Sequence, residues 1–178
     1  MTATNREAIS LLKNSPDEYE PDLVEIHEAG HVVMAFAVRA PITVVFGKKG
    51  SYGQCGANMD NISTIDIVKF LLGGVVAQCI AGFDNDQEVG LAVVDEFIIK
   101  SLFSPAGISK DWSDQRIETT KRRCRCVVKR HLEANWPAIE AIARALRSEK
   151  EIEGSRATEI LEEVESRGFH LRKKISRR

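Results

Sequence analysis

Residues 27–31 form the motif His-Glu-x-x-His inside an apolar stretch that runs from Val24 to Val38. An apolar run of this length indicates a buried helix, in which residues i and i+4 project from the same face, one turn apart. His27 and His31 would therefore present two imidazoles about 6 Å apart on a rigid support. Such a pair can bind one tetrahedral zinc ion.

Glu28 follows the first histidine directly, so its carboxylate can reach a water molecule held by the metal. Zinc lowers the pKa of such a water to about 7, and a neighbouring carboxylate can accept its proton. The motif therefore predicts metal-assisted hydrolysis, most simply of peptide bonds. The competing interpretation is a pair of core histidines that bind no metal. It leaves Glu28 without a role, although an unpaired buried carboxylate is costly.

The length of 178 residues suits one domain with a sizeable core. A net charge of −1 and a pI near 6.4 give no general attraction to nucleic acid or to an anionic membrane, so we expect no nucleic-acid partner. Apolar runs such as 71–83 are shorter than a bilayer span, and the N-terminus shows no signal peptide. The four cysteines lack Cys-x-x-Cys spacing, which favours free buried thiols. These features predict a cytoplasmic protein without an integral membrane segment.

The hydrophobic pattern predicts a mainly α chain with one small β element. A short helix is expected near residues 5–13, and Pro21 and Pro41 bound the helix with the metal motif. Three segments follow from the pattern: a helix and linker in 1–20, the main domain in 21–168 and a solvated basic tail in 169–178. The main domain then contains a β-hairpin in 42–46 and 52–59. A helix is expected in 65–81, whose glycine pair permits close helix packing or marks a kink. Further helices are expected in 89–103, from a cap at Ser109 to Ala134, from Pro137 to Leu146, and in 155–165.

Two histidines require a third protein ligand if a fourth position is to stay open for water. No Gly-x-x-His continuation follows His31, so this ligand must come from a distant part of the chain. The residues alone leave several candidates open: Asp84, Asp86, Asp95, Glu96, Asp111, Asp114 and His131.

The chain resembles the peptidase domain of the FtsH-type, AAA-linked zinc proteases over about residues 24–164, in collinear order. The resemblance implies a helical zinc-metallopeptidase domain with a small β-hairpin inserted after the zinc-binding helix. The segments that carry it are the zinc motif, Ile42-Thr43-Val44-Val45 through Tyr52-Gly53-Gln54, Leu71 to Gln78 with its glycine pair, Gly107-Ile108-Ser109-Lys110-Asp111-Trp112, and the region from Leu132 to Gly154.

The resemblance also implies roles for individual residues. Asp111 matches the aspartate that serves as the third zinc ligand, with Asp114 as a nearby competitor. The strand after the first β segment is expected at a sheet edge, where it pairs with an extended substrate; an ordinary hairpin without a ligand is the alternative. The residues then expected at the substrate are Tyr52, Gly53, Gln54, Cys55 and Gly56.

The implied activity is that of a zinc metalloendopeptidase acting on peptides or unfolded protein segments, and the resemblance also implies a homo-oligomer. Two departures bear on this expectation. Gln78 and Cys79 stand where the family has two acidic residues, and no Gly-x-x-x-x-Gly-Lys-Ser/Thr phosphate loop occurs in the sequence. The alternative is therefore a zinc-bearing, weakly active or inactive module that binds a partner, such as an ATPase supplied in trans.

Overall fold

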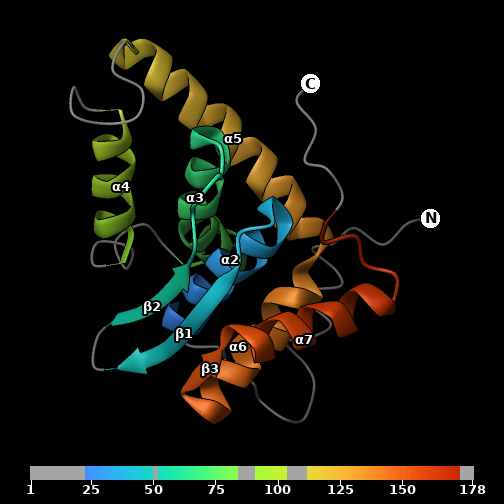
Figure 1. The fold of residues 1–178 in the computed structure, drawn as a ribbon. Helices are drawn as coiled ribbons and strands as arrows, with labels where there is room; N and C mark the ends of the chain where they lie inside the picture. The colour runs from blue at the N-terminus through green and yellow to red at the C-terminus, as the bar shows by residue number, and fades with distance from the viewer. Residues whose placement is uncertain (1–22, 50–51, 84–90, 104–111, 173–178) are drawn as a thin grey trace.

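The computed structural model describes residues 23–49, 52–83, 91–103 and 112–172 (Figure 1). These residues form six helices and a small three-stranded sheet, so the mainly α class is confirmed. The helix expected in 5–13 lies outside the described residues. In chain order the elements are α2 (Leu23–Val38), β1 (Ile42–Lys49), β2 (Tyr52–Ala57), α3 (Thr64–Ala81), α4 (Leu91–Leu102), α5 (Asp114–Ala134), α6 (Trp136–Glu149), β3 (Glu151–Glu153) and α7 (Gly154–Ser166).

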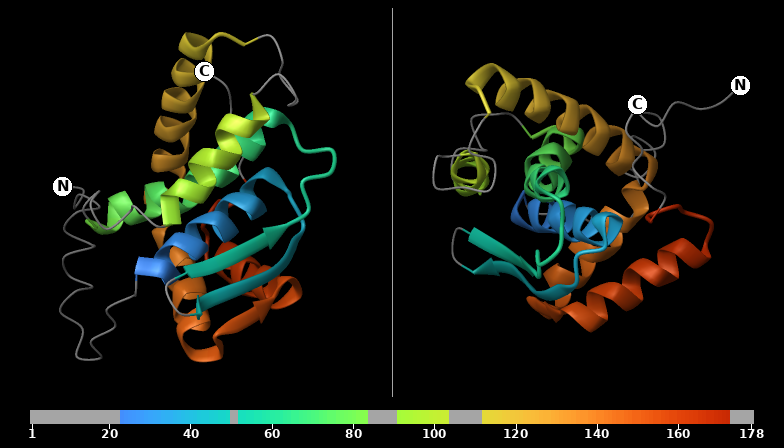
Figure 2. Two further views of the ribbon diagram at one scale, coloured as in Figure 1. Left: turned by 90° about the vertical axis from the view of Figure 1, so that its left-hand side faces the viewer. Right: turned by 45° about the horizontal axis from the view of Figure 1, so that its top comes forward.

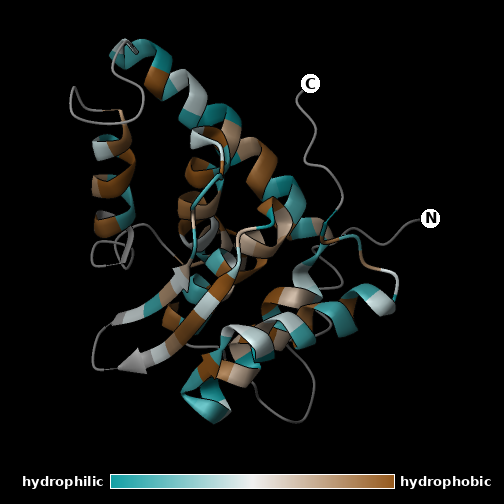
Figure 3. Cartoon of the chain, in the orientation of Figure 1, coloured by the Kyte–Doolittle hydropathy of each residue, from teal (hydrophilic) through white to brown (hydrophobic). Residues whose placement is uncertain are grey.

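Helix α2 lies at the centre of the molecule, between α3 on one side and the sheet and α6 on the other (Figures 1 and 2). Every residue from Val24 to Ala37 is buried. A helix that is apolar on all sides can be stable only when it is surrounded, which explains this central position. The hydropathy colouring shows the contrast with α5 and α7, which carry many polar residues (Figure 3). The metal motif thus lies on the most buried helix of the fold.

Helices α2 and α3 approach each other closely because glycines face each other across the contact. A Cβ atom on Gly73 would lie 2.5 Å from the carbonyl oxygen of Gly30, and one on Gly30 would overlap the backbone of Gly73. The close helix packing expected from the glycine pair is thereby confirmed. This contact brings α3 directly over the helix that carries the metal motif.

The sheet has the order β2-β1-β3, and both strand pairs are antiparallel. Val45, at its centre, pairs with Cys55 of β2 and with Ile152 of β3. The hairpin of β1 and β2 was expected, whereas β3 was not, because three residues are too few to give a strand signal. Strand β2 is an edge strand among the described residues, and it packs against α2.

Helix α3 is long and apolar enough to cross a membrane by length and composition alone. In this structure it packs against α2, α4 and α5, and 56% of the residues in its apolar stretch are buried. Core helices of folded domains share this composition, so the helix is accounted for by its packing. The helix begins at Thr64 and is therefore longer than the apolar run in 71–83, which by itself is shorter than a bilayer span.

Serine residues cap two of the helices. Ser63 caps α3, and its hydroxyl oxygen accepts a hydrogen bond from the backbone N–H of Asp66. Ser113 caps α5 by accepting from the backbone N–H of Arg116. The prediction that α5 begins at Ser109 is wrong, since the helix starts at Asp114; Ser109 itself lies outside the described residues.

All four cysteines are free, as expected, but they are not all buried. Cys124 is buried, whereas Cys79 and Cys126 are exposed and Cys55 is partly buried. Cys124 and Cys126 differ because residues two apart on a helix point in very different directions. The expectation of buried thiols is therefore wrong for Cys79 and Cys126.

Candidate metal centre

Three side chains from α2 and α4 converge on one point. The Nε2 atoms of His27 and His31 are 3.0 Å apart, and Oδ2 of Asp95 is 3.2 Å from each. Atoms bound to a tetrahedral zinc at about 2.0–2.2 Å are separated from one another by about 3.3 Å. The three atoms therefore form a triangle of the size of one face of a zinc coordination tetrahedron.

The histidines are held so that their Nε2 atoms face Asp95. Nδ1 of His31 lies 2.9 Å from the carbonyl oxygen of Phe70. A carbonyl only accepts, so Nδ1 of neutral His31 carries the proton and Nε2 keeps a lone pair. Gln78 is completely buried beside His27, and its amide nitrogen donates to the carbonyl oxygen of Leu23 at 3.4 Å. The carbonyl of Phe70 thus fixes the orientation of His31, as such neighbours do for histidines that bind metals, whereas Nδ1 of His27 has no hydrogen-bond partner among the described residues.

The donor set and the space around it fit a zinc ion. Two nitrogen lone pairs and a carboxylate oxygen face one another in a buried place, an arrangement that needs a cation. Apart from the two histidines, Oδ2 of Asp95 has no partner among the described residues. Gly74 leaves the neighbouring space open, since a Cβ atom there would lie 2.5 Å from Nε2 of His27 and 2.6 Å from Nε2 of His31. Two imidazoles and one carboxylate are typical ligands of catalytic zinc.

Without a metal, the cluster holds a proton. Burial alone would lower the pKa of His31, but the hydrogen bond and the charge of Asp95 raise it to about 9. Burial opposes ionisation of Asp95, yet hydrogen bonds from His27 and His31 bring its pKa down to about 2. The pKa of His27 is lowered, mainly by burial. The site therefore favours one positive charge beside Asp95, which a metal ion would supply when it displaces the proton.

Glu28 lies next to this cluster and is almost completely buried. Burial raises the pKa of its carboxyl group to about 7, with a further contribution from the negative charge of Asp95. A carboxylate with a pKa near neutrality is well suited to accept and return a proton. Strand β2 packs directly on it: a Cβ atom on Gly53 would lie 2.6 Å from Cγ of Glu28.

Strand β2 contains the residues expected at the substrate. Gly53 lies against Glu28, and Cys55 shares that face because side chains two apart in a strand point the same way. Burial raises the pKa of the Cys55 thiol, and the charges of Glu28 and Asp95 add to this effect. Gln54 is exposed on the opposite face. The structure thus brings two of the five residues to the metal motif; contact with a substrate remains a prediction.

Helix α4 positions Asp95, and several contacts hold this helix in place. Ile99, one turn after Asp95, is buried in the core. The carboxylate of Glu96 accepts a hydrogen bond of 2.5 Å from Nζ of Lys121 in α5. At the end of α4, the ring of Phe103 stacks on Trp112 with 5.0 Å between the ring centroids. These contacts attach the part of α4 that follows Asp95 to the core and to α5.

Asp95 was one of the open candidates for the third ligand, and of those that the structure describes it is the one placed at the histidines. Asp111, implied by the resemblance, lies outside the described residues. Asp114 is exposed at the start of α5 and is not part of the cluster. One signal could have favoured Asp95: it precedes the apolar Ile99 by one turn, on the side of α4 that faces the core.

Comparison with models of known protein families gives no match for this chain, and comparison with curated proteins finds no similar sequence.

Proposed function

We propose that this chain is a zinc-dependent metallopeptidase that hydrolyses peptide bonds in peptides or unfolded protein segments. One observation carries the proposal: His27, His31 and Asp95 form a triangle of the size required by zinc, with Glu28 beside it on the same helix. The helical domain with its hairpin is then a zinc-peptidase fold of the kind that the FtsH-type resemblance implies.

In this proposal His27, His31 and Asp95 hold the metal, and each other residue has a defined task. When bound, zinc would polarise the substrate carbonyl and make a water molecule more acidic. Glu28 accepts a proton from the attacking water, whose oxygen adds to the carbonyl carbon. The C–N bond then breaks as Glu28 passes the proton to the leaving amine. Gly53 and Gly74 have no side chains, which keeps space for these groups.

The position of β2 supports an extended peptide as the substrate. Its outer edge carries no strand partner among the described residues, and its inner face contacts Glu28 through Gly53. A peptide that pairs with this edge would place its main chain alongside the metal motif, which is a common mode of peptide recognition. Extended segments with a free main chain are most accessible in peptides and unfolded proteins, so these are the substrates that fit.

The decisive experiment compares cleavage of casein by the zinc-loaded wild-type chain and by Glu28→Gln. We expect the substitution to lower the rate by at least about 100-fold, the usual contribution of general acid–base catalysis. Zinc content should stay at one ion per chain, because Glu28 is not a ligand. Glu159→Gln, on the exposed side of α7, is the matched control and should cleave like the wild type.

Two results would count against this proposal. If Glu28→Gln cleaved casein at the wild-type rate, the assignment of the base would be wrong. If neither protein cleaved casein while each bound one zinc ion, the alternative of a metal-bearing module that binds a partner, such as a separate ATPase, would be favoured.

A further inference from the structure

Helix α5 concentrates positive charge in a chain whose net charge is only −1. Its sequence contains seven lysines and arginines and three acidic residues. From Lys121 to Arg130 six of ten residues are basic and none is acidic. The total charge of the chain therefore conceals a strongly basic helix.

The basic side chains of α5 form two rows along its outer surface. Residues three, four or seven apart lie on one line of a helix, and these two lines are separated by roughly 130° around the helix axis. The strip between them includes the uncharged residues Gln115, Thr119 and Cys126, with Glu133 near its C-terminal end. The first row consists of Arg116, Arg123 and Arg130, and the second of Arg122, Arg125 and Lys129.

Most of these charges have no acidic partner in the part of the chain that the structure describes. Arg122, Arg123 and Arg125 are exposed, and no ion pair among the described residues involves them. Lys129 lies 3.9 Å from Glu133, at the limit of an ion pair. Like charges so close together repel one another, and a bound polyanion would relieve that repulsion.

A shallow hollow at the start of α5 adds polar groups to the first row. It has a volume of about 440 Å³, and its lining includes Arg116, Arg123, Thr119 and Thr120. The guanidinium of Arg116 stacks on the ring of Trp112 at 4.1 Å, which fixes its position. Guanidinium and hydroxyl groups arranged in this way are donors that phosphate oxygens accept.

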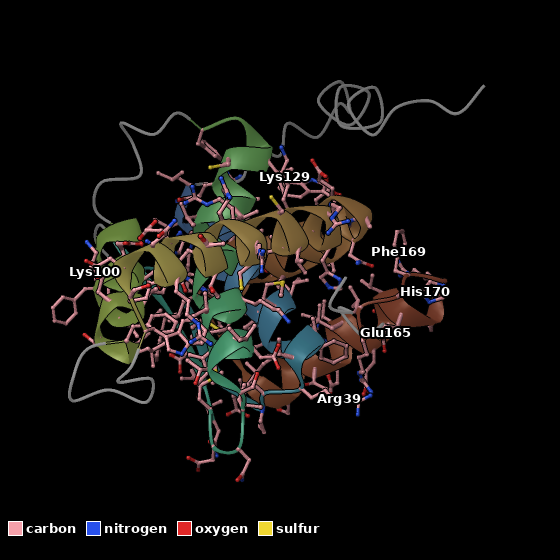
Figure 4. All side chains as sticks on the ribbon, turned by 90° about the horizontal axis from the view of Figure 1, so that it is seen from above. Arg39, Lys100, Lys129, Glu165, Phe169 and His170 are labelled. Carbon is pink, nitrogen blue, oxygen red and sulfur yellow. The ribbon has the colours of Figure 1, made fainter. Side chains whose placement is uncertain are left out.

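The first half of α5 projects from the body of the molecule (Figure 2). No described residue of the helix before Cys124 is buried. Figure 4 looks down on this helix, with Lys129 labelled. A helix with its side chains is about 10–12 Å wide, close to the width of about 12 Å of the major groove of B-form DNA. Basic rows on both sides of such a helix would face the phosphates on both sides of the groove.

We propose that α5 binds duplex DNA in the major groove, with its two basic rows on the phosphates of the two strands. An anionic membrane fits less well, because a membrane-bound helix adds apolar side chains to its basic face. The large exposed apolar residues of the described chain lie on α4 instead: Val94, Phe97 and Ile98. Duplex RNA also fits less well, since its deep major groove is too narrow for side chains to enter.

The test measures binding of the full chain to a fluorescent 24-base-pair DNA duplex between 50 and 200 mM salt. The six basic residues of the two rows predict about six phosphate contacts and a slope of about −5.4 for the logarithm of the affinity against the logarithm of the salt concentration. The triple variant Arg122→Gln, Arg123→Gln, Arg125→Gln should reduce the magnitude of that slope by about 2.7. The matched control Lys100→Gln, Arg156→Gln, Arg167→Gln removes the same charge elsewhere and should bind like the wild type.

Both triple variants keep the basic C-terminal tail, so a difference in DNA binding between them must arise from the substitutions in α5. All six substituted side chains are exposed, and circular dichroism would show that both variants fold. The proposal is overturned if no DNA binds at 50 mM salt, or if the two triple variants bind DNA equally well. It is also overturned if duplex RNA of the same sequence, or vesicles with 30% phosphatidylserine, bind as tightly as the DNA.

Discussion

The ionisable side chains of the candidate metal centre influence one another's pKa values, so removing one of them changes the charge of the others. Asp95 and Glu28 bring two carboxyl groups to a place where His27 and His31 are the nearest bases. The pKa of Asp95 is brought to about 2 and that of Glu28 is raised to about 7, so the two carboxyl groups differ although they are close neighbours. Two carboxyl groups with such different pKa values are suited to different tasks, one as a ligand and one as a base.

The identity of the third ligand can be tested by removing one carboxylate at a time. Asp95→Ala should weaken zinc binding by more than about 100-fold, since loss of a ligand exceeds the effect of losing a group that only supports one. Asp111→Ala and Asp114→Ala should keep the wild-type affinity, measured by competition with a chromophoric chelator. If Asp111→Ala lost zinc and Asp95→Ala kept it, the ligand assigned from the structure would be wrong.

The sequence predicted which nearby residues of the chain would lie together in this cluster, while their roles remain proposals. His27, Glu28 and His31 could be assigned because the period of a helix fixes how residues one turn apart are placed. Asp95 could not be selected from the other acidic residues, because its distance from the histidines depends on how α4 packs on α3 and α5. Long-range packing of this kind leaves no regular spacing in the sequence.

At the scale of the helices, two adjacent glycines in α3 have different roles. Gly73 faces the backbone of α2, whereas Gly74 faces the ends of two side chains, those of His27 and His31. Backbone atoms cannot move away without separating the helices, but an imidazole can turn. The same added methyl group should therefore affect folding at one position and metal binding at the next.

Gly73→Ala should lower the free energy of unfolding by about 2 kcal/mol or more, because the new methyl group overlaps the backbone of Gly30. Gly74→Ala should fold with nearly wild-type stability in the presence of a chelator, yet bind zinc at least about 100-fold more weakly. Urea unfolding and zinc titration would measure the two effects. Equal zinc affinity of Gly74→Ala and the wild type would show that the metal does not lie between the histidines and α3.

The helices and the hairpin were largely predictable because their hydrophobic periods are long and regular. Three features were not. The strand β3 is too short to give a signal, and it forms because Ile152 is buried beside Val45 of β1. The start of α5 was placed at Ser109 rather than at Ser113, since both serines precede the same polar stretch. The direct connection from α6 to β3 could not be predicted either, because β3 forms only by pairing with β1.

At the scale of the whole molecule, a histidine outside the metal centre links stability to pH. His131 in α5 is partly buried, and its Nε2 atom has no hydrogen-bond partner among the described residues. Burial lowers its pKa from 6.5 to about 4. The unfolded chain therefore takes up this proton more readily than the folded chain, so stability is lost as the pH falls from about 6.5 toward 4.

Comparison with His131→Gln isolates this contribution from the protonation of the metal ligands, which both proteins share. Between pH 7.5 and pH 5 the wild type should lose about 2 kcal/mol more of its free energy of unfolding than the variant, from about 1.4 kcal/mol for each unit of pKa difference. Urea unfolding with a chelator present would measure it. A parallel decline of the two proteins with pH would show that His131 is protonated equally in the folded and unfolded states.

The proposed third metal ligand, Asp95, comes from a helix on the outside of the fold, whereas the two histidines come from its most buried helix. Any free energy released when an ion binds to all three must also favour the attachment of α4 to the core. An ion bound to all three side chains would link α4 to α2, and its removal would weaken that attachment. A cell that limited zinc would thereby adjust how firmly α4, with its exposed apolar residues, is held against the rest of the molecule.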